Sequence, residues 1–270
     1  MTTVDKNKAR RFVFDPDDMA AILESVVRKH GTHDQSSHGR RGGGRDSMPY
    51  SWDPKRPDSN WFSENPVFAT QFMQEVASSP VSTRVTGETL DKIVEDGRFK
   101  TLDEIPQSAS GRDSQYRESR SRLEEDTWGV PKEEEKPLYG YFDTSDPRFT
   151  ESIDNYGDVQ ITLKDSVKGR TTLTGGDSLT SELIPVPVGD LQDGSASGVE
   201  MTSALTYSSG FSLSRGETPK VDYFEAQVHG GITLDDIRSV TILPSSKIKP
   251  STLAALKERG IEVIVKDGNK

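Results

Sequence analysis

The sequence predicts an α+β protein, in which a helical, partly disordered N-terminal region precedes a mainly antiparallel, split-sheet domain. Helical patterns dominate before residue 98, whereas short β-type runs separated by Gly and Asp turns follow Pro137. Only 31% of the 270 residues are hydrophobic and 29% are charged, so part of the chain is too polar to fold by itself. We therefore expect a helix and tether over 1–62 and an α+β domain over 63–270, with helices in 66–97 and a β-rich core in 137–270.

Residues 15–30 are expected to form an amphipathic helix. Asp15 suits the N-cap and Pro16 the first helical position, and Gly31 can end the helix. One face carries the apolar residues Met19, Ile22, Leu23, Val26 and Val27. No neighbouring segment offers a matching face, so the helix is expected to dock either on the distant domain or on another protein.

The next stretch, "KHGTHDQSSHGRRGGGRD", holds three of the four histidines of the chain. Neutral imidazoles together with an aspartate could ligate Zn²⁺, but the spacing fits no standard metal motif and we assign no metal site. The other interpretations are a flexible polar tether and a short motif that a partner recognises through its arginines. The residues concerned are His30, His33, His38, Asp34, Arg40 and Arg41.

Two helices are expected next, "PVFATQFMQEVASS" from Pro66 and "GETLDKIVEDG" ending at Gly97. Residues 107–136 are highly charged and form either a long loop or a surface helix around 116–126. Strands are expected at 138–142, 158–164, 182–188, 221–229, 239–244 and 261–266. The helix "KPSTLAALKERG", with Ser251 as its cap, lies between the last two and predicts a strand–helix–strand unit.

Composition excludes several classes of function. The net charge of −10 argues against a general nucleic-acid binder, and the absence of Cys removes disulfides and thiolate catalysis. No apolar run approaches the roughly 20 residues of a membrane span, and no secretory signal is visible. No P-loop, Rossmann fingerprint or Gly-x-Ser-x-Gly elbow is present. We expect the protein to act in the bacterial cytoplasm where it is made, or in a particle assembled there.

The segment 156–179 is a candidate anion site. A predicted strand leads to Arg170, Thr171 and Thr172, and then to a Gly-rich turn with Asp177 and Ser178. A cation, hydroxyl donors and exposed backbone N–H groups suit a phosphate or a ribose. The alternative is a plain β-hairpin with a glycine turn.

The segment "YFEAQVHGG" places Glu225, Gln227 and His229 on one face of a strand by the period of two. These residues are either a solvated face of an antiparallel sheet or the wall of a site. In a site, Glu225 would act on a sugar hydroxyl or as a general base.

Four blocks in order resemble uncharacterised proteins of actinobacteria and their phages: "EDGRFKT", "EKPLYGYF", "YGDVQITLKDSVKGRTTLTGGDSL" and "YFEAQVHGGITLDDIRSVTI". The match spans about residues 85–245. The stretch "KHGTHDQSSHGRRGG" is also similar to a segment of head-associated proteins of actinobacterial tailed phages. These resemblances imply a phage-encoded, virion-carried protein whose residues 1–60 contact phage head or portal proteins.

The β region also resembles the mono-ADP-ribosyltransferases. That family splits a small sheet around NAD and uses a first-strand Arg or His, a Ser/Thr strand and a late Gln/Glu-x-Glu strand. The late strand would correspond to Glu225-Ala226-Gln227, which places Gln227 at the position of the catalytic Glu, and "LYGYF" offers Tyr139 and Tyr141 instead of Arg or His. Either Glu225 is the working carboxylate, or the domain is inactive as a transferase.

The first hypothesis is therefore a phage-encoded ADP-ribosyltransferase-like protein that uses NAD as substrate and modifies a host protein. Its catalytic residues would be Glu225, Gln227 and His229, and its cofactor-binding residues would be Tyr139, Arg170, Thr171, Thr172, Asp177 and Ser178. The rival is a non-enzymatic head- or portal-associated structural or accessory protein. A third hypothesis is a metal- or nucleic-acid-binding module based on the His/Arg segment.

Overall fold

The computed structural model describes residues 66–106, 114–129, 136–144, 149, 153, 156–179, 185–196 and 223–266. The expected helix 15–30, the tether over 31–62 and the cluster of His30, His33 and His38 lie outside the described residues.

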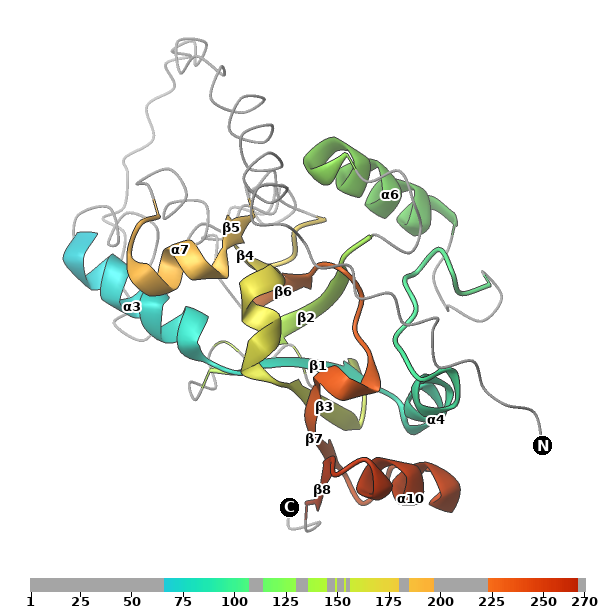
Figure 1. Ribbon diagram of the computed structural model, residues 1–270. Coiled ribbons are helices and arrows are strands. Elements are labelled where there is room, and N and C mark those ends of the chain that lie inside the picture. The colour runs from blue at the N-terminus through green and yellow to red at the C-terminus, as the bar shows by residue number, and fades with distance from the viewer. Residues whose placement is uncertain are drawn as a thin grey trace, which may run out of the picture.

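Eight strands form one sheet in the order β5-β4-β6-β2-β1-β3-β7-β8 (Figure 1). All neighbouring strands are antiparallel except β7 and β8, which confirms the predicted α+β class and the mainly antiparallel sheet. The strands are Val81–Val85 (β1), Leu138–Phe142 (β2), Val159–Leu163 (β3), Thr171–Gly175 (β4), Val186–Pro187 (β5), Phe224–Val228 (β6), Ile237–Ile242 (β7) and Glu262–Val265 (β8).

The sheet consists of two four-stranded halves that meet at a short junction. β1 and β2 are in register at only two residue pairs, Val81 with Phe142 and Ser82 with Tyr141, whereas β1 and β3 pair at four. Gly140 lies at this junction, where a Cβ would come 2.5 Å from the backbone oxygen of Ser82. The absence of a side chain at Gly140 therefore allows the halves to approach each other.

Five α-helices surround the sheet in the described residues: Pro66–Ser78 (α3), Gly87–Asp96 (α4), Ser114–Trp128 (α6), Val188–Asp193 (α7) and Pro250–Glu258 (α10). The two helices predicted within 66–97 are confirmed, and the described part of the charged segment forms a helix and not a long loop. Two 3₁₀-helices, Asp165–Arg170 (η5) and Leu234–Asp236 (η6), lead into β4 and β7. No described helix combines the length and the apolar character needed to span a bilayer.

Two strands were not predicted. β1 lies between the two helices expected within 66–97. Its sequence "VSTRV" is rich in β-branched residues but short. β4 is formed by the Thr-rich run "TTLTG", which was interpreted as part of a site or a hairpin. β4 does not form a hairpin with β3; it pairs antiparallel with β6 and with β5, the next strand along the chain after the Gly-rich turn. The turn of η5 carries the chain from one half of the sheet to the other.

Two further details differ from the prediction. The described end of the strand expected over 182–188 is only Val186–Pro187, and Val188 begins α7. Proline has no N–H for the ladder, which explains why the strand ends there. Ser251 does not cap α10, because Pro250 takes the first turn and Asp91 of α4 instead accepts bonds from Lys249 N and Thr252 Oγ1.

In the half of the sheet that contains β4, β6 and β2, one face is apolar and the other is polar. Phe224, Ala226 and Val228 belong to one buried apolar core that includes residues of α3 and α7, and the Phe72 ring of α3 lies 5.9 Å from that of Phe224. The opposite face carries Glu225 and Gln227 and is covered by side chains of α6. The candidate site lies on this second face.

Candidate functional site

Strand β6 places Glu225 and Gln227 on the same face of the sheet, and both side chains are buried, with exposed fractions of 4% and 0%. Their neighbours in register on β4 are Thr174 and Thr172. The neighbours on β2 are Tyr141 and Tyr139. Side chains opposite each other on paired strands share a face, so this part of the sheet carries hydroxyl, amide and carboxyl groups where an apolar layer would be ordinary.

Three donors converge on one oxygen of the Glu225 carboxyl. Ser178 Oγ donates to Glu225 Oε1 at 2.5 Å, Ser178 N approaches it at 3.4 Å, and Gln227 Nε2 donates at 2.8 Å. Burial, and secondarily the charge of Asp177, raise the pKa of Glu225 above its usual value, although Arg120 and the bonds from Ser178 and Gln227 oppose the shift. The carboxyl is therefore fixed in position and poorly solvated.

The amide of Gln227 is oriented by the threonines of β4. Its Nε2 donates to Thr174 Oγ1 at 2.9 Å as well as to Glu225, and its Oε1 accepts from Thr172 Oγ1 at 2.9 Å. Because the oxygen and the nitrogen have distinct partners, the amide can direct its N–H groups only toward Glu225 and Thr174.

His229 extends the network beyond the end of β6. Its Nε2 lies 3.1 Å from Thr172 Oγ1, and its ring meets the Trp128 ring edge to face at 5.4 Å. Burial, together with the nearby charge of Arg170, lowers the pKa of His229 to about 4. His229 is therefore neutral at pH 7 and serves as a hydrogen-bonding group.

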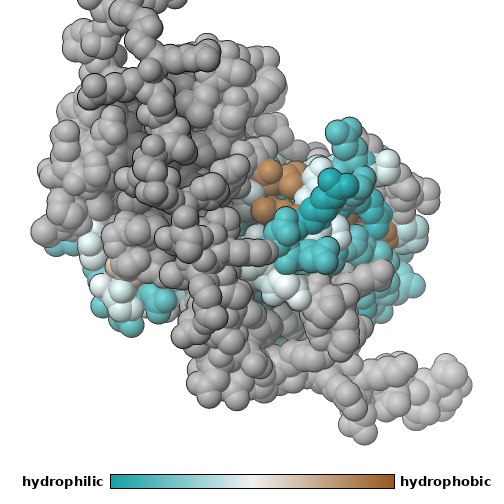
Figure 2. Space-filling model, turned by 90° about the horizontal axis from the view of Figure 1, so that it is seen from above, coloured by the Kyte–Doolittle hydropathy of each residue, from teal (hydrophilic) through white to brown (hydrophobic). Residues whose placement is uncertain are grey.

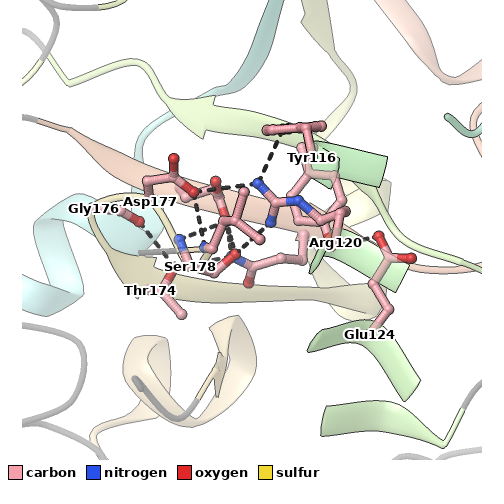
Figure 3. A network of polar contacts seen from close by, with 11 residues as sticks. Tyr116, Arg120, Glu124, Thr174, Gly176, Asp177 and Ser178 are labelled. Carbon is pink, nitrogen blue, oxygen red and sulfur yellow. Dashed lines mark hydrogen bonds and ion pairs between the residues drawn. The ribbon is translucent and has the colours of Figure 1, made fainter. Parts of the chain in front are cut away.

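Arg120 of α6 covers the carboxyl network (Figure 3). Its Nη1 donates to Ser178 Oγ at 2.9 Å, and its Nη2 forms an ion pair with Asp177 Oδ1 at 3.2 Å. The guanidinium also lies 4.2 Å from the centre of the Tyr139 ring and 5.8 Å from that of Tyr116. The side chain of Arg120 is only 6% exposed, so this cation is held within the protein against the site.

Arg120 was not predicted from the sequence. The buried residues of α6 are Arg120, Glu124 and Trp128, which recur every four positions. Residues four positions apart lie on one face of a helix, and this is the face through which a helix contacts a sheet. Two of the three residues on this face are charged. A search for apolar periodicity therefore misses this face, whereas a search that admits charged residues at a spacing of four would include Arg120 and Glu124 together with Trp128.

A cavity of about 180 Å³ lies beside Arg120, between α6 and β2. Glu124 contributes to its wall, where Oε1 accepts from Tyr139 OH at 2.9 Å and Oε2 lies 3.3 Å from Lys136 Nζ. Burial raises the pKa of Glu124. Lys136 also contacts Ser121 Oγ at 2.7 Å and Asp103. The described exterior on this side is largely hydrophilic, as the view from above shows (Figure 2).

Most of the residues proposed from the sequence come together in this network: Glu225, Gln227, His229, Tyr139, Thr172, Asp177 and Ser178. Arg170 and Thr171 do not reach it. The Arg170 guanidinium donates to the backbone oxygens of His229 and Gly231 and pairs with Asp236 at 3.1 Å. Thr171 Oγ1 donates to Val167 O at 2.8 Å. Both residues therefore stabilise the chain around η5 and the end of β6.

The described residues contain no group of three or more His, Asp or Glu side chains arranged to hold a metal ion. What the network does offer is a desolvated carboxyl fixed by amide and hydroxyl donors, with a guanidinium and two tyrosines beside it. Such a group can place negative charge against a cation that develops during a reaction.

No protein-family model matches the chain. The Gene 2 protein of Mycobacterium phage L5 is 28% identical to it over 240 residues, which cover 81% of this chain and 85% of that protein. The Gene 2 protein of Mycobacterium phage D29 is 31% identical over 176 residues, which cover 58% and 62%. The resemblance to proteins of actinobacterial phages is thus confirmed.

Among solved structures, DarT of Thermus sp. 2.9 in complex with ADP-ribosylated single-stranded DNA aligns with a TM-score of 0.43 and 12% identity. This alignment covers 70% of the present chain and 94% of DarT. The same protein in complex with NAD⁺ aligns with a TM-score of 0.40.

Proposed function

We propose that this protein is an ADP-ribosyltransferase that cleaves NAD and transfers its ADP-ribose to a host acceptor. The observation that carries the proposal is the buried Glu225 carboxyl, held by Ser178 and Gln227 on a polar face of the sheet. Leaving a carboxyl buried is costly in free energy, and perturbed carboxyls of this kind concentrate at functional sites.

The proposed chemistry is a displacement at C1′ of the nicotinamide ribose. The C1′–N1 bond breaks, and nicotinamide leaves as a neutral molecule with the bonding electrons. A nitrogen or oxygen of the acceptor forms the new bond to C1′ and releases its proton to solvent. The transition state has oxocarbenium character, so a carboxylate in a low-dielectric site stabilises it more than it stabilises the ground state.

Glu225 takes the electrostatic part in this proposal, and Gln227 positions it. The amide of Gln227 carries no charge, but its Nε2 donates to Glu225 Oε1 at 2.8 Å and its orientation is set by Thr172 and Thr174. His229 in turn contacts Thr172. The order Glu-x-Gln then supplies one charged and one neutral group from a single strand face.

Arg120 is the cation that we assign to the phosphates of NAD. The sequence pointed to Arg170 for this task, but its guanidinium is engaged by two backbone oxygens and by Asp236. Arg120 lies between the carboxyl network and the cavity beside α6. Movement of Arg120 from Asp177 and Ser178 toward a bound pyrophosphate would open a path to Glu225, with Tyr139 forming the wall.

The test is transfer of label from [adenylate-³²P]NAD into a lysate of host bacteria by the full-length protein. We expect labelled macromolecules with wild type and none with Glu225→Gln, which preserves the shape and one acceptor oxygen of the side chain while removing its charge. Glu258→Gln is the matched control, since Glu258 is exposed at the end of α10, and it should label as wild type does. Digestion of the product with protease or nuclease identifies the class of acceptor. Equal labelling by Glu225→Gln and wild type would refute the role of Glu225.

A second candidate function is a head- or portal-associated protein without chemistry, carried in the virion. The similarity of residues 29–43 to a segment of phage head-associated proteins favours it, and the two functions are compatible if the enzyme travels with the head. We expect the protein to co-purify with phage heads and a variant lacking residues 1–45 not to do so. Recovery of wild type only in the soluble fraction of infected cells would contradict the association.

A further inference from the structure

Strand β8 forms one edge of the sheet and presents a sequence that is complementary to itself. It pairs with β7 on one side, and no described strand lies on its other side. Ile264 and Val265 are 40% and 64% exposed, and together with Tyr156 they are the exposed large hydrophobic residues of the described chain. Exposed edges with apolar side chains are sites of strand addition.

The backbone direction of β8 follows from its bond to β7. Lys266 N donates to Ile242 O at 2.9 Å, so the N–H and C=O groups of Lys266, and by alternation those of Ile264 and Glu262, are directed toward β7. The corresponding groups of Val263 and Val265 are directed outward. An added antiparallel strand must therefore place its own outward-facing residues opposite Val263 and Val265.

We propose that β8 pairs antiparallel with β8 of a second copy of this chain, about a two-fold axis through Ile264. In this register Val263 lies opposite Val265 of the second copy, and Ile264 lies opposite Ile264. Glu262 then lies opposite Lys266 of the second copy, and Lys266 opposite Glu262. Apolar residues thus meet apolar residues, and each acid meets a base, on both sides of the axis.

Other registers lose this match. A shift of two residues retains the hydrogen-bonding pattern but places either Glu262 or Lys266 opposite Ile264. The close approach of side chains at non-hydrogen-bonded pairs applies to the positions of Glu262, Ile264 and Lys266, where the charge match and the central apolar contact occur. Because the pairing uses a single short strand, we expect a dimer that dissociates at concentrations on the order of micromolar.

The experiment is sedimentation analysis of the full-length protein between about 1 and 300 μM, a range that brackets the expected dissociation. We expect dimers at the upper end for wild type, and at least a tenfold weaker dimer for Glu262→Lys and for Lys266→Glu, because each places like charges opposite each other. An equimolar mixture of these two variants should restore dimers, since every cross-strand pair is then of opposite charge. Glu95→Lys makes the same charge change at an exposed position of α4 and should dimerise as wild type does.

A wild-type protein that stays monomeric over the whole range would overturn the proposal, and the charged ends of β8 would then protect a bare edge. Dimers that persist equally in both single variants would also overturn it, since they would use another surface. Failure of the mixture to recover dimers would exclude the antiparallel register.

Discussion

At the scale of single residues, the ionisation of Glu225 links the structure to the proposed activity. Its pKa lies above the usual 4.5 because the carboxyl is buried, and the positive charge of Arg120 limits the shift. The proposed chemistry needs the ionised form, so kcat/KM, which reports the ionisation of the free enzyme, should rise with pH through this elevated pKa. Arg120→Met removes the opposing cation and should move the acid limb of the pH–rate profile to higher pH.

The control for this shift is Arg122→Met, since Arg122 is an exposed arginine on the same helix and pairs with Glu118 in the solvent. Its acid limb should coincide with that of wild type. If the acid limb of Arg120→Met instead coincided with that of wild type, Arg120 would have no influence on the ionisation of Glu225.

His229 makes the stability of the protein depend on pH. Its pKa falls from 6.5 to about 4 on folding, so the unfolded chain binds the proton more strongly. The stability associated with neutral His229 is present above pH 6.5 and is lost as the pH falls toward 4. Between pH 7 and pH 5 we expect His229→Gln to lose about 2 kcal/mol less unfolding free energy than wild type, measured by urea denaturation. Parallel losses in the two proteins would show that His229 titrates alike when folded and unfolded.

The sequence predicted some site residues because they follow a simple period. The alternation of "EAQVH" put Glu225, Gln227 and His229 on one face, and the network contains all three. Arg120 was missed because it lies more than fifty residues from its partners Ser178 and Asp177. It also belongs to a highly charged segment, whose composition is typical of an exposed surface. Arg170 is the opposite case. It was assigned to the site because it precedes a Gly-rich turn, but its guanidinium donates to the backbone oxygens of His229 and Gly231.

At the scale of secondary-structure elements, the junction between β1 and β2 is the sensitive point. Gly140→Ala would place a Cβ 2.5 Å from the backbone oxygen of Ser82, and this clash can be relieved only by moving a strand. We expect a loss of about 1–3 kcal/mol of unfolding free energy in chemical denaturation. Gly169→Ala is the control, because a Cβ there meets nothing within 4 Å, and its effect should stay within about 0.5 kcal/mol. Equal stability of the two variants would contradict the close approach.

Element boundaries also show where sequence patterns are insufficient. Helix α4 was predicted correctly, and its ends are specified locally by the Thr86 cap and by Gly97 with a φ of 77°. The strands β1 and β4 depend on partners far away in sequence, in β2, β3, β5 and β6. Short strands without alternation are recognised mainly through such pairing, which a single sequence does not display.

At the scale of the whole molecule, one buried core extends through both halves of the sheet and includes residues of α3, α4, α7 and α10. The apolar layer under β6 is therefore provided by α3 and α7, which leaves the opposite face available for the polar network beneath α6 (Figure 1). The sequence predicted the α+β class and the change of texture near residue 137 from composition and periodicity. It did not predict that α6, a mostly polar helix, packs across the site, because that contact is made by charged side chains.

The most direct measurement is the release of nicotinamide from NAD by the purified full-length protein in the presence of host lysate. The account predicts that each NAD consumed yields one nicotinamide and that Glu225→Gln releases none while its circular dichroism spectrum and unfolding midpoint match those of a folded protein. Unchanged NAD with the wild-type protein, or equal nicotinamide release by folded Glu225→Gln, would contradict the assignment of Glu225 as the carboxylate that drives the reaction.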